Sequence, residues 1–241
     1  MPSTTKHGKR YQGASKLVDR QKNYSPEEAV ELVKQTAVAK FDESIELHIN
    51  TNADPRHADQ QIRTIATLPN GTGKTIRVLA FVQGESVSVA REAGVDFIGD
   101  EDTIESIEKD GWTDFDVAIA TADMMGRIGR LGRTLGRKGL MPNPRTGTVV
   151  QPQDLPRAIQ EAKGGRIEIR MDRTANLHIV VGKASFSEEA LLTNITATLD
   201  AVSKARPVST KGQFFNQIYL TTTMGPSIKL DMAQALALKV L

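Results

Sequence analysis

Four Gly-Arg pairs follow one another within twelve residues, beginning at Gly126, Gly129, Gly132 and Gly136. Glycine lets a backbone approach a ligand closely, and the arginine guanidinium is a planar fork that matches phosphate oxygens. The wider segment 126–145 carries six basic and no acidic residues. This pattern favours contact with a polyanion such as RNA. The alternative is a plain solvated basic loop that contacts nothing.

A second candidate segment is the run Thr221-Thr222-Thr223-Met224-Gly225-Pro226-Ser227. Small hydroxyls and freed backbone amides can bind the 2′-OH and phosphate groups of RNA, and a methionine can pack on a base or ribose. Thr221 and Thr223 fall on the same side of an extended strand, as a shared binding face requires. Taken alone, the segment is also compatible with an ordinary β-turn.

Other patterns associated with catalysis or cofactors are incomplete. The segment 70–75 resembles a phosphate loop, but Leu68 stands where that motif needs a glycine, and the segment precedes a strand. Gly126, Gly129 and Gly132 lack the dinucleotide-binding spacing. The segment 84–88 lacks the closing glycine of a nucleophile elbow. The histidines show no metal-ligand spacing and stand at His7, His48, His57 and His178. We therefore expect no enzyme, no cofactor and no metal.

The charge is distributed unevenly although the net charge is only +2. Residues 1–22 hold six Lys or Arg against Asp19, whereas residues 92–116 hold ten acids against Lys109. Blocks of one sign are typical of steering or contact surfaces. The basic blocks favour RNA, and the acidic block leaves open a protein-interaction module.

Length and composition limit the class of protein. With 241 residues, 39% hydrophobic and 25% charged, the chain is long enough for one or two globular domains. Its longest apolar run, Val78–Val82, is too short to cross a bilayer, and the N-terminus lacks the apolar stretch of a signal peptide. Zero cysteines fit a reducing cytosol. We expect a soluble protein.

Both ends of the chain predict antiparallel strands and helices. Ser25-Pro26 begins a helix, and strict alternation over 44–50 predicts a half-buried strand. Strands at 166–171 and 177–181 are expected to form a hairpin. Further strands are predicted at 214–222 and 227–230, and the tail 231–241 is left as a short helix or disorder. A helix after Ser187 is predicted to bury a stripe formed by Leu192, Ile195, Leu199 and Val202.

The middle of the chain has a different pattern. Apolar strands at 76–82, 95–98 and 117–120 alternate with short helices, one ending at Gly94 and one near 104–108. This alternation of apolar strands and short helices predicts a parallel sheet with helices covering both faces. We therefore predict an α/β protein of two domains: a discontinuous α+β outer domain of residues 1–70 and 165–241, and an inserted Rossmann-like domain of residues 71–164. Two strands of chain would join them as a hinge.

Several motifs together resemble the universal large-subunit ribosomal protein L-one family, of bacterial type. They are Lys6-His7-Gly8-Lys9-Arg10-Tyr11, Lys40-Phe41-Asp42-Glu43, Leu68-Pro69-Asn70-Gly71, Ile119-Ala120-Thr121, Gly136–Pro144 and Thr221–Ser227. The resemblance covers nearly the whole chain. Two departures are Arg137 and Ala122, where the family usually has proline; both fall in the inserted domain and bear on the shape of its loops.

The resemblance implies a function in translation. Proteins of this family bind the ribosomal RNA of a mobile stalk, help transfer RNA leave the exit site, and in bacteria repress translation of their own messenger. It implies a monomer within the cytoplasmic ribosome, without membrane contact. A generic RNA-binding or protein-interaction module remains the alternative.

The resemblance also implies site residues. The main RNA contact would lie on the outer domain at Lys40, Phe41, Asp172, Thr174, His178, Thr221, Thr223, Met224 and Gly225. A second, looser contact with ribosomal or transfer RNA would lie at Arg130, Arg133, Arg137 and Lys138. Lys40 would pair with phosphate, Phe41 and Met224 would give apolar contact, and Asp172 would accept from a 2′-OH.

Overall fold

The computed structural model describes residues 8–238, and within it the chain forms two compact units. The outer unit comprises the chain up to Gly73 together with the chain from Ile167 onward, and the inserted unit comprises Lys74–Arg166. The chain therefore crosses from the outer to the inserted unit between residues 73 and 74 and returns between residues 166 and 167. The sequence predicted these two boundaries after residues 70 and 164. None of the helices among the described residues is long and apolar enough to cross a membrane.

Four helices belong to the outer unit: α1 (Lys9–Ser15), α2 (Pro26–Thr36), α8 (Glu188–Lys204) and α9 (Met232–Ala237). The start of α2 is as predicted, because the Ser25 hydroxyl accepts the N–H of Glu28 and Pro26 occupies the first turn. Ser187 caps α8 in the same way. The predicted apolar stripe of α8 is wrong at one position, since Leu191 is fully buried and Leu192 only half-buried.

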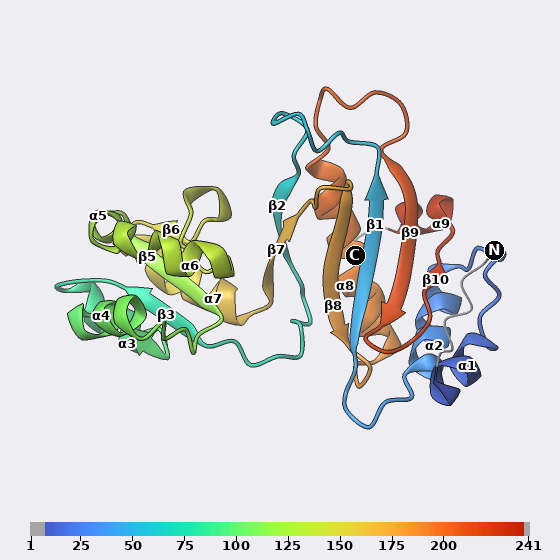
Figure 1. The fold of residues 1–241 in the computed structure, drawn as a ribbon, viewed down its shortest axis with the longest axis horizontal. Coiled ribbons are helices and arrows are strands. Elements are labelled where there is room, and N and C mark those ends of the chain that lie inside the picture. The colour runs from blue at the N-terminus through green and yellow to red at the C-terminus, as the bar shows by residue number, and fades with distance from the viewer. Residues whose placement is uncertain (1–7, 239–241) are drawn as a thin grey trace. The chain divides into compact units, whose positions relative to one another are not determined.

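The main sheet of the outer unit has the strand order β10-β9-β1-β8 and is antiparallel (Figure 1). Its strands are β1 (Ser44–Thr51), β8 (Asn176–Lys183), β9 (Phe215–Thr222) and β10 (Ile228–Lys229). Burial alternates along β1 as predicted: Ile45, Leu47 and Ile49 are fully buried, and the residues between them are half-buried. The buried face forms one core with α2 and α8, and the opposite face carries polar side chains.

The predicted hairpin of 166–171 with 177–181 is wrong. β7 (Arg166–Arg170) pairs with β2 (Arg63–Thr67) in a separate two-stranded sheet, and β8 pairs with β1. Only an isolated bridge joins Met171 to Leu177. β7 and β8 thus each pair with a strand that is distant in sequence. This arrangement places Ile169 and Leu177 in the same core as α8.

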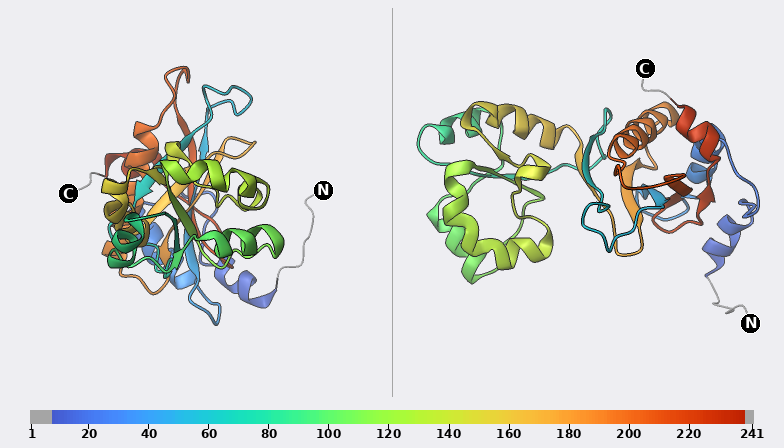
Figure 2. Two further views of the ribbon diagram at one scale, coloured as in Figure 1. Left: turned by 90° about the vertical axis from the view of Figure 1, so that its left-hand side faces the viewer. Right: turned by 90° about the horizontal axis from the view of Figure 1, so that it is seen from above.

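The inserted unit is a parallel sheet covered on both faces, as predicted. Its order is β4-β3-β5-β6, formed by β3 (Val78–Phe81), β4 (Phe97–Ile98), β5 (Val117–Thr121) and β6 (Val149–Val150). Helices α3 (Ser86–Glu92) and α7 (Leu155–Lys163) cover one face. Helices α4 (Glu101–Lys109), α5 (Met125–Ile128) and α6 (Gly132–Lys138) cover the other, as the right-hand view of Figure 2 shows. The α/β fold class is confirmed.

Short 3-10 turns connect several of these elements. They are η1 (Ala122–Met124), η2 (Gly129–Leu131), η3 (Pro144–Thr146) and η4 (Pro152–Asp154). The Gly-Arg segment, for which a solvated basic loop was the alternative, is largely helical: α5, η2 and α6 follow one another from Met125 to Lys138. Ile128, Leu131 and Leu135 are buried in the sheet core, and their spacing of three and four residues turns the intervening basic side chains outward.

The two ends of the chain are described in part. Lys6 and His7, which open the first motif of the resemblance, lie outside the described residues, and the basic start is described only from Gly8. At the other end the tail forms the short helix α9, whose start is capped when the Asp231 carboxylate accepts the N–H of Gln234. Residues 239–241 lie outside the described residues.

Candidate nucleic-acid interface

A buried carboxylate joins two loops at one end of the outer sheet. Glu43 is only 1% exposed, and its oxygens accept the backbone N–H groups of Ala39 at 2.8 Å and Met224 at 2.9 Å. Its carbonyl accepts from the N–H of Ala184 at 2.9 Å. Because β1 begins at Ser44, directly after Glu43, these bonds fix two segments against the same end of β1. The segments are the loop 37–43 and the turn 223–227 after β9, and we call them the loop pair.

The loop pair holds large apolar side chains in solvent. Phe41 is 56% and Met224 60% exposed, and Val38 lies on the same loop at 44%. Lys40 is exposed beside them. Single exposed apolar residues are common on proteins, but three on two segments joined by a buried carboxylate form a local feature. The loop pair thus offers apolar surface next to a cation, which suits a sugar or base next to a phosphate.

The threonines of the loop pair are bonded into its backbone. The Thr223 hydroxyl accepts the N–H of Ser44 at 3.0 Å and lies 3.3 Å from the Ser44 carbonyl, to which it donates. The Thr221 hydroxyl lies 3.1 Å from the carbonyl of Thr222 and 3.4 Å from that of Gly225. Each hydroxyl oxygen keeps acceptor capacity for a ligand hydroxyl. Glycine is required at 225 because a Cβ there would collide with the Thr222 hydroxyl.

The turn between β7 and β8 is organised by Asp172. One of its oxygens accepts the N–H groups of Thr174 and Asn176, both at 2.8 Å, and the other accepts the Thr174 hydroxyl at 2.7 Å. Burial raises the pKa of Asp172, but these bonds and the nearby His178 outweigh it and lower the pKa to about 2. Asp172 therefore organises its own turn, and with 36% of its side chain exposed the carboxylate keeps acceptor capacity for the expected 2′-OH.

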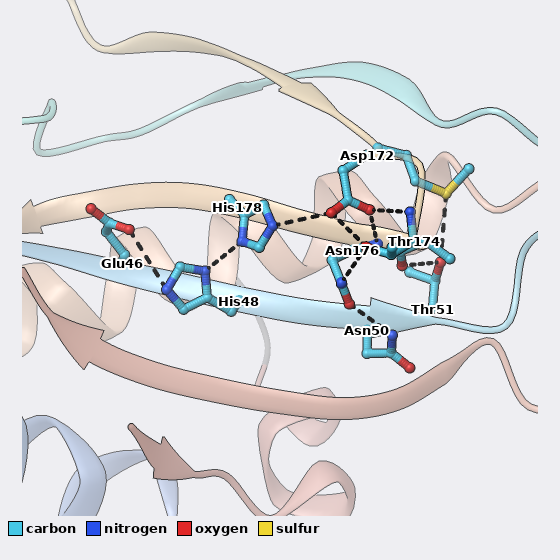
Figure 3. Close-up of polar contacts among 10 residues, drawn as sticks. Glu46, His48, Asn50, Thr51, Asp172, Thr174, Asn176 and His178 are labelled. Atoms are coloured by element: carbon cyan, nitrogen blue, oxygen red, sulfur yellow. Dashed lines mark hydrogen bonds and ion pairs between the residues drawn. The ribbon is translucent and has the colours of Figure 1, made fainter. Parts of the chain in front are cut away.

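Two histidines meet on the open, polar face of the sheet. His48 on β1 and His178 on β8 are direct partners in the strand register, and their Nδ1 atoms are 2.8 Å apart (Figure 3). Each Nε2 faces a carboxylate: Glu46 lies 3.6 Å from His48, and Asp172 lies 3.5 Å from His178.

Amide side chains continue this polar row along the strands. The Nδ2 of Asn50 donates to Asn176 at 2.7 Å, and Asn176 in turn donates to the Thr174 hydroxyl at 2.9 Å (Figure 3). The Nδ2 of Asn216, on β9, donates to Asn50 at 3.0 Å. A line of bonded polar side chains therefore runs across β9, β1 and β8 to the turn after β7.

The nine residues of the predicted main contact form two groups on the outer unit. Six lie on or beside the loop pair: Lys40, Phe41, Thr221, Thr223, Met224 and Gly225. The other three, Asp172, Thr174 and His178, surround the turn before β8. Glu46 lies between the groups, opposite Thr221 in the register and next to His48.

Sequence reasoning missed three residues of this surface. Glu43 was part of a quoted motif, but its burial was not predicted, because a carboxylate before a strand normally faces solvent. His48 and Asn50 stand in the polar phase of β1, which was visible in the sequence. Their partners His178 and Asn176 depend on a strand register that the sequence did not reveal.

The predicted second contact lies on the outer side of the α5–η2–α6 segment. Arg130, Arg133, Arg137 and Lys138 are all exposed. The Nε of Arg130 lies 3.4 Å from a Glu108 oxygen, and Lys138 donates to the Thr113 hydroxyl. The glycines between these residues face open space, with no heavy atom within 4 Å of an added Cβ at Gly129, Gly132 or Gly136. The outer side of this segment is thus basic and has no side chain at its glycine positions, and its inner side packs into the core of the inserted unit.

Part of the acidic block is paired with basic residues of the inserted unit. Asp116 pairs with Lys74 and Arg77, Asp96 lies 3.0 Å from Lys163, and Glu105 lies 2.7 Å from Lys109. These pairs involve only some of the ten acids, so the protein-interaction alternative stays open.

No group of three or more His, Cys, Asp or Glu side chains in the described part of the chain is arranged to hold a metal ion. What the outer unit presents instead is a bonded polar face that ends in an exposed apolar loop pair. Such a surface defines a binding protein.

Comparison with known proteins identifies the family. The sequence model of the Ribosomal protein L1p/L10e family matches residues 33–226, and the chain belongs to this family. It is 58% identical over 229 residues to "Large ribosomal subunit protein uL1" of Thermomicrobium roseum, with 95% of each chain covered. Proteins of the same name from Chloroflexus aggregans and Dehalococcoides mccartyi are 52% identical over 235 residues and 50% identical over 226 residues. These cover 98% and 94% of this chain and 99% and 95% of the relatives. The resemblance seen in the sequence, including its bacterial type, is confirmed.

Proposed function

We propose that the outer unit grips the folded ribosomal RNA of the large-subunit stalk with the loop pair and the polar sheet face. Family membership supplies the coarser part: the chain is a structural, RNA-associated constituent of the large ribosomal subunit in the cytoplasm and is not an enzyme. The finer part, namely the stalk, release of deacylated tRNA from the exit site, and repression of the chain's own messenger, is our proposal.

One observation carries the proposal: Glu43 holds Phe41 and Met224, two exposed apolar side chains, on one bonded platform beside Lys40. Apolar and aromatic side chains pack on bases and sugars, and a neighbouring lysine neutralises phosphate. The bonded backbone presents these groups without a large ordering cost. A similar RNA fold in the messenger would bind the same surface, which makes repression a competition with ribosomal RNA.

The basic surface of α5, η2 and α6 supports the second part of the proposal. Its arginines are exposed on a helical segment, so they contact phosphates and carry little base specificity. We assign this surface to a looser contact with ribosomal RNA or with the transfer RNA leaving the exit site. The outer unit gives shape-specific affinity, and the inserted unit gives a salt-sensitive contact.

The test is the affinity for the folded stalk segment against a scrambled duplex of equal length, measured over a range of salt. We expect a preference for the stalk that persists at high salt, because phosphate attraction alone fades steeply with salt. Met224→Asp should weaken stalk binding by at least about 2 kcal/mol, since it places an unpaired charge against RNA. Val208→Asp, at a fully exposed position elsewhere on the outer unit, is the matched control.

A second pair of variants tests whether the proposed contacts of the outer unit and of the inserted unit have different functions. Arg133→Glu with Arg137→Glu should slow transfer RNA release in whole ribosomes more than it weakens binding of the isolated stalk. Arg91→Glu, on α3 at the opposite face of the inserted sheet, controls for a change of charge alone. Equal binding to stalk and scrambled duplex would reduce the chain to a generic polyanion binder. Equal losses in both assays would contradict the division between the units.

A further inference from the structure

The His48–His178 pair poses a problem of proton placement. A carboxylate only accepts hydrogen bonds, so Glu46 and Asp172 each favour an N–H on the Nε2 that faces them. A neutral imidazole carries one N–H, and with that hydrogen on Nε2 its Nδ1 is a lone pair. Two neutral histidines that satisfy both carboxylates would therefore direct two lone pairs at each other across 2.8 Å.

One additional proton resolves the conflict. With three protons on four nitrogens, each Nε2 carries a hydrogen toward its carboxylate, and one Nδ1 donates to the other. A fourth proton would place two N–H groups against each other and break the contact. The 2.8 Å separation is that of a hydrogen bond, so one Nδ1 carries a hydrogen. If both Nε2 also carry hydrogens toward their carboxylates, the pair is an imidazole bonded to an imidazolium.

We propose that His48 and His178 hold one shared proton, and that its positive charge makes RNA binding on this sheet face stronger as the pH falls. The proton site follows from the geometry of the pair alone. The effect on RNA rests on the proposed function of the outer unit.

The ring geometry favours a proton over a metal ion. The ring centroids lie 4.9 Å apart, close to the most that a 2.8 Å contact between Nδ1 atoms permits, so the two nitrogens face each other nearly end to end. A hydrogen bond prefers this straight arrangement. Two ligands of one tetragonal or tetrahedral metal ion would instead converge on it at an angle.

The surroundings of the two rings favour His178 as the donor and His48 as the acceptor of this hydrogen bond. Burial lowers the pKa of His48, the charge of His178 lowers it further, and Glu46 raises it only in part. His178 is more exposed, with 54% of its side chain in solvent against 28% for His48, and it faces Asp172, which stays ionised because its pKa is about 2. His48 is therefore the neutral acceptor, and its role is to position the imidazolium of His178.

The neighbouring charges explain the effect on RNA. Glu46 on β1 and Asp172 in the turn before β8 are anions beside the pair, Tyr219 on β9 stands opposite His48, and Lys229 on β10 stands opposite Tyr219. Lys183 at the end of β8 donates to Ser44, and Arg173 of the turn is exposed. Without the shared proton two carboxylates face the ligand beside a neutral pair. The proton offsets one of them and so reduces repulsion of phosphate.

The first experiment needs no RNA. Nitrogen-15 NMR of the histidine rings in the full chain, titrated from about pH 5 to about pH 8, reports the protonation of each nitrogen across the range in which histidines titrate. We expect a protonated His178 beside a neutral His48 that is protonated on Nε2. His48→Leu removes the acceptor and should abolish the hydrogen-bonded N–H signal between the two rings, whereas His48→Gln keeps an acceptor oxygen and should retain a hydrogen-bonded N–H on His178. His57→Gln, in the loop between β1 and β2, is the control.

The second experiment is stalk RNA affinity over the same pH range. For the unaltered chain and His57→Gln we expect affinity to rise about three- to tenfold toward acid, with the bound RNA raising the proton-binding constant of the pair by the same factor. His48→Leu should flatten this dependence, and His48→Gln should restore it. Independent titration of the two histidines, a His48→Leu variant with an unchanged pH profile, or a pair signal abolished by a chelator would each overturn the proposal. Absence of stalk binding at every pH would refute the proposed function alone, since the NMR result would still stand.

Discussion

At the scale of single residues, the candidate interface depends on polar side chains that are satisfied within the protein. Glu43 and Asp172 each organise a backbone segment of the interface. They accept backbone N–H groups and so fix the two segments that carry the exposed residues. Removal of a buried acceptor costs more than the bond it made, because the donor left behind is unsatisfied.

Glu43→Gln tests the first of these roles. Glutamine offers one acceptor oxygen for the two N–H groups of Ala39 and Met224, and its amide would face the other as a second donor. We expect a loss of about 2 kcal/mol of unfolding free energy, measured by urea denaturation, together with weaker stalk binding. Glu31→Gln, on the exposed side of α2, should change stability by less than about 0.5 kcal/mol. A stable Glu43→Gln variant with full RNA affinity would show that the loop pair needs no such anchor.

Asp172 gives the protein an acid-dependent contribution to stability. Its pKa is about 2 in the fold against 3.8 ordinarily, so the ionised form is favoured by folding. The contribution is present above about pH 4 and is lost as the pH falls through the window from about 4 to about 2. After allowance for a side chain that is 36% exposed, it amounts to about 1 kcal/mol. Urea midpoints at three pH values should show Asp172→Asn less stable at neutral pH and closer to the unaltered chain near pH 2; a constant difference would contradict this.

The sequence pointed to the exposed residues of the candidate interface but not to the residues that support them. Met224 stood out between threonines and Gly-Pro, and Phe41 was named through the family resemblance. Glu43 and His48 carry no such signal, since their importance comes from partners more than 120 residues away in the chain. Only the folded register of β1, β8 and β9 brings those partners together.

At the scale of elements, periodicity predicted what each segment is but not what it pairs with. The alternation along β1 and the parallel strands of the inserted unit were predicted because burial on one or both faces selects side chains locally. The 166–171 hairpin was wrong because β7 finds its partner in β2, across the whole inserted unit. The Gly-Arg segment was not recognised as helical because glycine obscured the spacing of Ile128, Leu131 and Leu135.

Helix α8 is joined to its surroundings by one buried amide. Asn194 is fully buried, donates to the carbonyls of Val181 at 2.7 Å and Gly71 at 2.9 Å, and accepts the N–H of Asn70 at 3.1 Å. It ties the helix to β8 and to the turn that leads toward the inserted unit. This is the reason that a polar residue occupies the apolar side of α8.

Asn194→Ala should therefore destabilise the outer unit by about 2 kcal/mol, since the buried carbonyl of Val181 and two partly buried backbone groups lose their partner. Thr193→Ala is the neighbouring control: its exposed hydroxyl bonds only to the carbonyl of Glu189, so we expect a change within about 0.5 kcal/mol. Urea denaturation monitored by far-ultraviolet circular dichroism measures both variants. Equal unfolding free energies of the two variants would show that the hydrogen bonds of the Asn194 amide do not stabilise the outer unit.

At the scale of the whole molecule, each unit has its own hydrophobic core. The buried clusters around β3 and β5 contain only residues of the inserted unit, and the cluster around β1 contains only residues of the outer unit. Within residues 8–238 the two units share no core residue, which is the condition for independent folding. The sequence also predicted that the two segments joining the units act as a hinge, and this stays a prediction.

Replacement of residues 74–166 by a short Gly-Ser linker should consequently leave the outer unit folded. We expect cooperative urea unfolding and stalk affinity within about threefold of the full chain, since every residue of the proposed main contact remains. The excised segment 74–166 should unfold cooperatively as well. A linker variant that does not fold would show that the outer unit depends on the insertion; a folded variant without affinity would move the main RNA contact to the inserted unit.

The central position of β1 sets an order of events during synthesis. Its neighbours β8 and β9 are both encoded after the insertion, so β1 emerges from the ribosome early and stays unpaired while residues 74–166 are made. The inserted unit is continuous in the chain and can collapse first, because its strand contacts are closer in sequence. The loop pair is completed only when Met224 meets Glu43. A nascent chain thus completes the proposed RNA-binding surface only after β9 and the turn that carries Met224 have been made.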